Sequence, residues 1–275
     1  MSCWQEQYVM ATCLFNENSL DEALSRIAAA GFRWVEISAN RKHLDPRVNP
    51  DVPAARSLLK KLGLRVHSIH APFSGLKIGH PDVDPKESQP RVVGVSLSFG
   101  AQVGARIAVV HATCDPEGLS DQMYERSRAA SMAFIDELRR QARRLGITLA
   151  LENLGRRPHL RRRFGSSLKE LSEAFPSQDI GFCLDVGHMA RNGLAIRSEI
   201  EAAGQRLISI HANSNDGVRD LHWLPTQGVP DWAEVKSELT RSGYGGRYVL
   251  EIKGSRDPDA TLRRIVEFVK ADATS

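Results

Sequence analysis

The stretch DIGFCLDVGH (179–188) decides the fold, because it is an apolar run that ends in an acidic residue and a histidine. The same pattern recurs in ITLALEN (147–153), RLISIHANSNDGVRDLH (206–222) and YVLEI (248–252). Ionisable groups at the ends of buried strands are costly unless something pairs them, so a series of them indicates a common role. Each stretch therefore predicts a buried strand that delivers an ionisable side chain to one end of a sheet.

Outward from these stretches, short apolar runs alternate with helix-like segments along the whole chain. Eight strand–helix units predict an α/β fold, a single (β/α)8 TIM barrel domain over residues 1–275. A doubly wound open sheet would instead need a glycine-rich turn after the first strand, where the sequence reads CLFNENSLDE (13–22). The strands are expected at 8–12, 33–38, 64–71, 106–112, 147–153, 179–186, 206–212 and 247–252, and the helices at roughly 19–30, 51–62, 88–103, 120–145, 167–175, 194–203, 231–242 and 258–271.

The composition is that of an ordinary globular protein, with 41% hydrophobic and 25% charged residues in a chain of 275. No stretch approaches the roughly 20 apolar residues that cross a membrane, and the N-terminus MSCWQEQYVM lacks the regions of a signal peptide. The four cysteines have no CxxC spacing, which is typical of reduced thiols, and we expect a cytoplasmic protein. The formal net charge of +4 mildly favours anionic ligands.

In each of these strands the ionisable residue is the last one expected to face the barrel interior. Side chains alternate along a strand, so Glu251 shares its face with Val249, and His70 shares its face with Ser68. If Glu251 points in, we expect Lys253, just beyond it, to point away. The C-terminal rim of a barrel is where active sites form. The candidate site residues at this rim are His70, His111, Glu152, Asp185, His188, His211, Asp220, His222 and Glu251.

Carboxylates gathered at one rim would repel one another without cations, so their convergence indicates a metal site, although any one of them alone would suggest only a hydrogen-bonded rim residue. Asp185 and His188 flank a Val-Gly turn, so both can reach one ion. Asp220 and His222 lie two apart, hence on one face of an extended segment. A ligand set suited to one divalent ion (Mn²⁺, Mg²⁺, Co²⁺, Fe²⁺ or Zn²⁺) is formed by Glu152, Asp185, His211 and Glu251.

These motifs resemble a known superfamily. They are HAPF (70–73), VVHA (109–112), LEN (151–153), CLDVGH (183–188), IHANSNDG (210–217), DLHWLPTQGVPDW (220–232) and LEI (250–252). Through them the chain is similar to the xylose isomerase-like TIM-barrel superfamily, which holds sugar isomerases and epimerases together with class II apurinic endonucleases. In the sugar branch, the resemblance implies one divalent ion on the four-residue ligand set and a contact from His188 to a substrate oxygen. In the endonuclease branch it implies up to three zinc ions on all nine positions.

Two features favour the sugar branch of this superfamily. The segment from His222 to Trp232 resembles the HLPxGxG segment of sugar isomerase-like members, although Trp223 and Thr226-Gln227 depart from it. The rim loops also show no run of intercalating aromatic residues, which DNA distortion would favour.

The resemblance therefore implies a metal-dependent isomerase or epimerase of a sugar, sugar phosphate, sugar acid or inositol-type polyol. Protons would pass through an enediolate between Glu152 and Glu251, the expected catalytic pair. The alternatives are a multinuclear-zinc phosphodiesterase that resembles apurinic endonucleases, and a dehydratase of a keto-polyol that uses the same metal site. As partner we expect a small carbohydrate rather than nucleic acid and no membrane, and we leave a homo-oligomer open.

A basic stretch follows the strand that ends at Glu152. It reads GRRPHLRRRFGSS (155–167) and offers Arg156, Arg157 and Arg161 as candidate anion-binding residues. A solvated basic loop is the alternative. For Glu36, in the second strand, structural ion pairing and contact with substrate are equally open.

Overall fold

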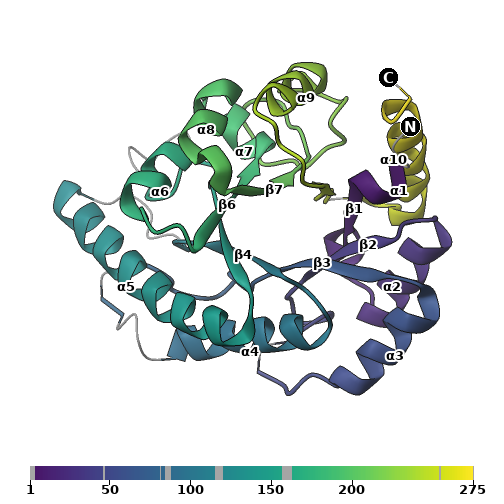
Figure 1. Ribbon diagram of the computed structural model, residues 1–275, viewed down its shortest axis with the longest axis horizontal. Helices are drawn as coiled ribbons and strands as arrows, with labels where there is room; N and C mark the ends of the chain where they lie inside the picture. Colours follow the sequence, from purple (N-terminus) through teal and green to yellow (C-terminus); the bar gives the residue numbers. More distant parts are fainter. Residues whose placement is uncertain are drawn as a thin grey trace.

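The computed structural model describes residues 4–45, 47–80, 82–83, 88–114, 120–156, 163–253 and 255–274. In this part of the chain eight parallel strands pair in sequence order, and the last pairs with the first to close a barrel. The helices lie outside the ring of strands (Figure 1). The strands are β1 (Tyr8–Ala11), β2 (Trp34–Ser38), β3 (Arg65–His70), β4 (Ile107–His111), β5 (Thr148–Glu152), β6 (Ile180–Asp185), β7 (Leu207–His211) and β8 (Tyr248–Leu250).

A helix of the expected length follows each strand, which confirms the (β/α)8 TIM barrel. All boundaries of these elements agree with the sequence prediction to within two residues. None of the described helices combines the length and the hydropathy needed to cross a membrane. The helices are α2 (Leu20–Ala29), α3 (Val52–Leu62), α4 (Ser88–Gln102), α5 (Asp121–Leu145), α6 (Leu168–Ala174), α8 (Ile196–Ala203), α9 (Trp232–Arg241) and α10 (Pro258–Asp272).

Local signals fix where the helices begin and end. At the start of α2, the Ser19 hydroxyl accepts a hydrogen bond from the Glu22 amide, and the Glu22 carboxylate accepts one from the Ser19 amide. Asp51 caps α3 in a similar way. The same helix ends at Gly63, whose φ of +67° is a conformation that favours glycine. These caps fix where α2 and α3 begin and where α3 ends.

Two short helices and a shorter last strand differ from the prediction. Helix α7 (Val186–Arg191) begins directly after β6, where the sequence predicts only a Val-Gly turn. A six-residue helix is too short to produce a recognisable hydrophobic period in a sequence. Helix α1 (Trp4–Gln7) precedes β1. Strand β8 ends at Leu250, so Glu251 lies one residue past its strand rather than inside it.

The barrel wall divides the apolar core into separate clusters. The extensive cluster that contains Phe134 and Leu138 of α5 packs between strands and helices. Alternation along the strands assigns the two smaller clusters to the barrel interior. Because their members are small, they leave the space at the rim to longer side chains. They contain Val9, Ala11, Cys13 and Val249 in one, and Val109, Ala150 and Cys183 in the other.

At the N-terminal ends of the strands, charged side chains gather around one indole ring. The guanidinium carbons of Arg65 and Arg247 lie 4.1 and 3.7 Å from the centroid of the Trp34 ring. The Trp34 indole N–H donates to Glu6 over 2.9 Å, and the same carboxylate lies 2.6 Å from the Arg65 guanidinium. Several cations here share one carboxylate, which is an arrangement that stabilises the fold rather than one that carries out a reaction.

Candidate functional site

The opposite, C-terminal ends of the strands carry the residues that the sequence predicts for a site. Strands β3 to β7 each end in one of them, and Glu251 directly follows β8. In the sheet register, His111 pairs with Glu152 and Asp185 pairs with His211, so neighbouring strands present their ionisable ends side by side. All nine predicted residues come together at this mouth, and all but Asp220, whose side chain is 44% exposed, are buried.

Glu152 lies at the centre of the mouth and is surrounded by imidazoles. Its carboxylate oxygens lie 3.1 Å from His111 Nε2 and 3.2 Å from His70 Nε2. They also lie 3.4 Å from Nδ1 of both His188 and His211. Burial alone would raise the pKa of Glu152, but His211 and His111 hold it well below its usual range. The carboxylate is therefore ionised although it is almost completely buried.

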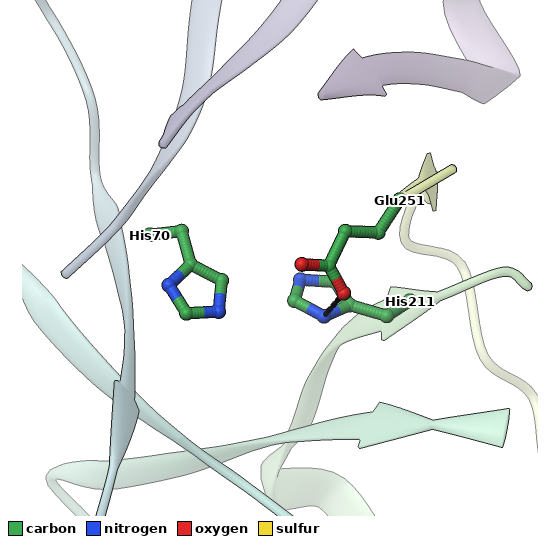
Figure 2. Close-up of side chains that lie close together, drawn as sticks. All are labelled: His70, His211 and Glu251. Atoms are coloured by element: carbon green, nitrogen blue, oxygen red, sulfur yellow. Dashed lines mark ion pairs between the residues drawn. The ribbon is translucent and has the colours of Figure 1, made fainter. Parts of the chain in front are cut away.

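Four side chains from four strand ends converge on one point. Each offers a ligand atom within 4.8 Å of the others. The Nδ1 atom of His211 and the Oε2 atom of Glu251 lie 3.2 Å apart, as the dashed line in Figure 2 shows. Both atoms are buried, and among the described residues neither makes a hydrogen bond. The lone pairs of these two atoms face one another without a hydrogen-bond donor, so a divalent cation fits between them. The four residues are Glu152, Asp185, His211 and Glu251.

Backbone hydrogen bonds fix which nitrogen three of the histidines present to the mouth. The Nδ1 atoms of His70, His188 and His222 each lie 3.0 Å from a backbone carbonyl oxygen, to which an N–H must donate. Their Nε2 atoms are thereby directed toward the other site residues. Fixing the outer nitrogen in this way is how proteins orient histidine ligands.

His211 has the reverse arrangement, because its outer partner is a side chain. Its Nε2 atom lies 3.3 and 3.4 Å from the two carboxylate oxygens of Glu36, and its Nδ1 atom faces the mouth. Glu36 is completely buried and accepts a second hydrogen bond, over 2.7 Å, from the Ser68 hydroxyl. Glu36 therefore has a structural ion-pairing role beneath the mouth. A carboxylate behind a histidine orients the ring and raises its basicity as a ligand.

Asparagines hold Asp185 in place, and the sequence analysis did not single them out. Asn153 exchanges two hydrogen bonds with the backbone of Asp185, over 2.7 and 3.0 Å. Asn213 donates to the Asp185 carboxylate over 2.8 Å. Asp185 also caps α7 by accepting the His188 amide. The signal was present in the sequence, because LEN and HAN place these asparagines one and two residues after Glu152 and His211.

At another side of the mouth, helix α7 contacts the segment before α9. The carboxylate of Asp220 lies 3.2 Å from His188 Nε2 and 3.3 Å from His222 Nε2. His222 has a φ of +46°, which is uncommon for a residue other than glycine. His222 thus departs from the extended conformation that the sequence predicts, whereas the two side chains do lie on one side of the segment, as predicted. Asp185, His188 and His222 also form a candidate metal-binding group.

Lys253 points into the mouth, so the expectation that it would point away was wrong. Residues two apart share a face in extended chain, and Glu251 itself points in. The Lys253 ammonium lies 2.6 Å from Glu251 Oε1 and donates a hydrogen bond over 3.3 Å to His222 Nε2. Its side chain is 31% exposed.

A cavity of about 530 Å³ opens directly over the mouth. Glu152, His188 and Glu251 line its floor, and Phe73 and Arg163 are among the residues around it. A second cavity of about 820 Å³ adjoins it, since Phe73, Glu251 and Lys253 line both cavities. The site can therefore receive a small polar molecule beside the carboxylates.

The arginine-rich loop contributes to this region in part. Arg157 and Arg161 lie outside the described residues. Arg156 is exposed and lines a separate cavity of about 350 Å³ rather than the one over the mouth. Arg163 lines both of these cavities and donates to the Gly155 carbonyl over 2.6 Å. Arg163 lies in the predicted basic stretch 155–167 but is not one of its three predicted anion-binding residues.

Comparisons with known proteins agree with this fold. An uncharacterized protein of Methanocaldococcus jannaschii, MJ1311, is 23% identical over 96% of this chain and 89% of its own length. The crystal structure of a D-tagatose 3-epimerase-like protein superposes with a TM-score of 0.78, at 21% identity, over 98% of each chain. The 3-keto-D-glucoside 4-epimerase YcjR of E. coli superposes with a TM-score of 0.77, at 18% identity, over 96% of this chain and 99% of its own. Residues 24–271 match the family described as xylose isomerase-like TIM barrel, so the chain belongs to that family.

Proposed function

We propose that this protein is a divalent-metal-dependent sugar epimerase or isomerase that moves a proton at a carbon next to a carbonyl. The observation that carries the proposal is the position of Glu152 and Glu251. Both belong to the four-residue ligand group, and both also line the cavity where a substrate would lie. In this proposal residues 1–275 form a single catalytic domain.

The ligand group fits one divalent ion of the first transition row or Mg²⁺, held by Glu152, Asp185, His211 and Glu251. Such an ion would supply Lewis-acid polarisation of the substrate carbonyl and hydroxyl. Glu36 behind His211 and Asn213 against Asp185 would keep two of the ligands oriented.

The chain's own residues account for the proton transfers. Glu152 and Glu251 approach the cavity from β5 and from the end of β8, so one can remove a proton and the other can return it to the opposite face of the carbon. Burial would raise the pKa of Glu251, but Lys253 and His222 hold it well below its usual range. Both carboxylates are therefore ionised before substrate arrives. His188, which lines the same cavity, would contact a substrate oxygen through Nε2.

The comparisons support a keto-sugar as the substrate class. One structural neighbour is named as a D-tagatose 3-epimerase-like protein and another as a 3-keto-D-glucoside 4-epimerase, and both sugars carry a keto group. At about 20% identity this likeness shows the fold alone, so the substrate remains part of the proposal.

The test is proton exchange at the substrate carbon in deuterated water. We would incubate the protein, loaded separately with Mn²⁺, Mg²⁺, Co²⁺ and Zn²⁺, with ketohexoses, ketohexose phosphates and 3-keto-glucosides, and follow deuterium incorporation by NMR. We expect exchange and a new epimer or isomer with at least one substrate class. A product that has lost water would establish the dehydratase instead. Absence of exchange with every class and metal would contradict proton transfer at this site.

A second candidate is multi-metal phosphodiester hydrolysis, favoured by overlapping ligand groups that share residues. Besides the four-residue group, His70, His111 and Glu152 form a group, as do Asp185, His188 and His222. A zinc-loaded sample that cleaves an abasic-site DNA duplex would establish this second function. Binding of the duplex without cleavage would leave the sugar proposal in place, because arginine–phosphate contacts alone can produce it.

A further inference from the structure

We propose that the Lys253 ammonium is a built-in cation that takes the place of a metal ion beside His222. The three residues at this side of the mouth, His188, Asp220 and His222, would then hold no metal ion of their own. This inference goes beyond the proposed function, because it concerns how many metal ions the chain binds and applies to either reaction.

The first argument comes from the hydrogen bonds that the two ring nitrogens of His222 make. An imidazole has two ring nitrogens, and Nδ1 of His222 donates its N–H to the Glu251 carbonyl oxygen over 3.0 Å. The Nε2 atom is left with one lone pair, and the Asp220 carboxylate lies 3.3 Å from the same atom. Lys253 lies 3.3 Å from that atom, and because an ammonium has only donors, it uses this lone pair. A metal ion would need the same lone pair.

The second argument is charge. The Lys253 ammonium is anchored by Glu251 Oε1 at 2.6 Å, and Glu251 Oε2 remains directed at His211. One oxygen of Glu251 thus pairs with the ammonium, and the other belongs to the four-residue group. A divalent ion bound to His222 would be attracted by Asp220, which lies 3.3 Å from the ring, but the fixed positive charge of Lys253 would repel it.

Backbone contacts hold the lysine at this place. The Lys253 amide donates to the His222 carbonyl oxygen over 3.2 Å, so main chain and side chain connect the same two residues. The left-handed turn at His222 is part of this connection. Lys253 also lines both cavities at the mouth, so its charge faces a bound substrate.

The test is the number of zinc ions bound per chain. We would dialyse the wild type and Lys253→Met against ZnCl₂, with no substrate present, and measure zinc by elemental analysis and isothermal titration calorimetry. We expect Lys253→Met to bind one more zinc ion than the wild type. The double variant Lys253→Met/His222→Ala should return to the wild-type number, because the added ion needs His222.

Two controls separate charge from general disturbance. Lys253→Arg keeps the positive charge and should bind the wild-type number of ions. Lys42→Met removes an exposed lysine of the adjoining cavity and should also bind the wild-type number. The inference is overturned if Lys253→Met binds no additional zinc while it melts like the wild type, or if the wild type already binds a zinc ion that His222→Ala removes. Because no turnover is measured, either result is independent of whether the sugar reaction is found.

Discussion

Charged side chains gather at both ends of the barrel, but the two ends differ in how these charges are paired. At the N-terminal end, Glu6 is partly exposed and is shared by arginines that also pack on Trp34. At the C-terminal mouth, Glu152 is 1% exposed and is surrounded by imidazoles rather than by permanent cations. In the first arrangement the one carboxylate is paired with cations. The second leaves lone pairs on His211 and Glu251 that no described residue satisfies.

Two histidines show the same contrast in their pKa values. Burial lowers the pKa of His67, near Trp34, to about 4. Burial would also lower the pKa of His188, but Asp185 and Asp220 raise it well above its usual range. Similar burial of the same residue type thus gives opposite results, because the carboxylates at His188 outweigh burial, whereas the charge of Glu36 does not do so at His67. A charged cluster indicates a site when acids converge without enough cations to pair them.

The largest expected effect follows from removing the central acid of the mouth. Glu152→Gln keeps the size of the side chain but loses a proton acceptor and a metal ligand, so kcat should fall by at least about 10³-fold. The measurement is deuterium exchange at the substrate carbon, with the metal content of the variant determined in parallel. Glu6→Gln is the matched change at the other end and should leave kcat unchanged. Wild-type exchange in Glu152→Gln would contradict a proton-transfer role for this residue.

A smaller effect is expected from the buried acid beneath the mouth. Glu36→Gln weakens the partner that orients His211, so affinity for the divalent ion should fall by roughly 10- to 100-fold. Competition with a chelator of known affinity measures this change. Glu199→Gln is the control, since Glu199 is an equally buried glutamate that accepts the Leu168 amide away from the mouth. Equal affinity in Glu36→Gln and the wild type would show that Glu36 serves only packing.

The smallest effect is a pH dependence of stability at the other end. The folded-state pKa of His67 is about 4, below the ordinary value of 6.5, so the unfolded chain binds more protons between these values. Stability contributed by neutral His67 is therefore present above pH 6.5 and is lost as the pH falls toward 4. From pH 7 to 5.5 the loss should be about 1 kcal/mol. Denaturant unfolding of His67→Phe should show a shallower acid loss than the wild type, and an identical loss would refute this assignment.

The sequence predicted the barrel and the membership of the mouth well, because both depend on alternation along strands. Each apolar run ends in a polar residue, and that pattern survives small errors in strand boundaries. It failed where the chain leaves regular structure. The left-handed turn at His222 depends on contacts with a segment that is far apart in sequence. The inward direction of Lys253 follows from the alternation itself, which places residues 251 and 253 on one face, so that expectation misapplied the pattern. The role of Glu36 was undecided for the same reason, since its partner His211 lies 175 residues away.

The layer of small side chains inside the barrel has a consequence for how this mouth can change. Val9, Ala11, Val109 and Ala150 fill the interior below the rim without taking part in the packing between strands and helices. Substitutions at the rim should therefore change the chemistry of the site with little effect on the apolar contacts that hold the fold. Conversely, an enlarged residue in this layer, such as at Ala150 below Glu152, would raise the floor of the mouth. Reactivity and architecture can in this way be redesigned almost independently of each other.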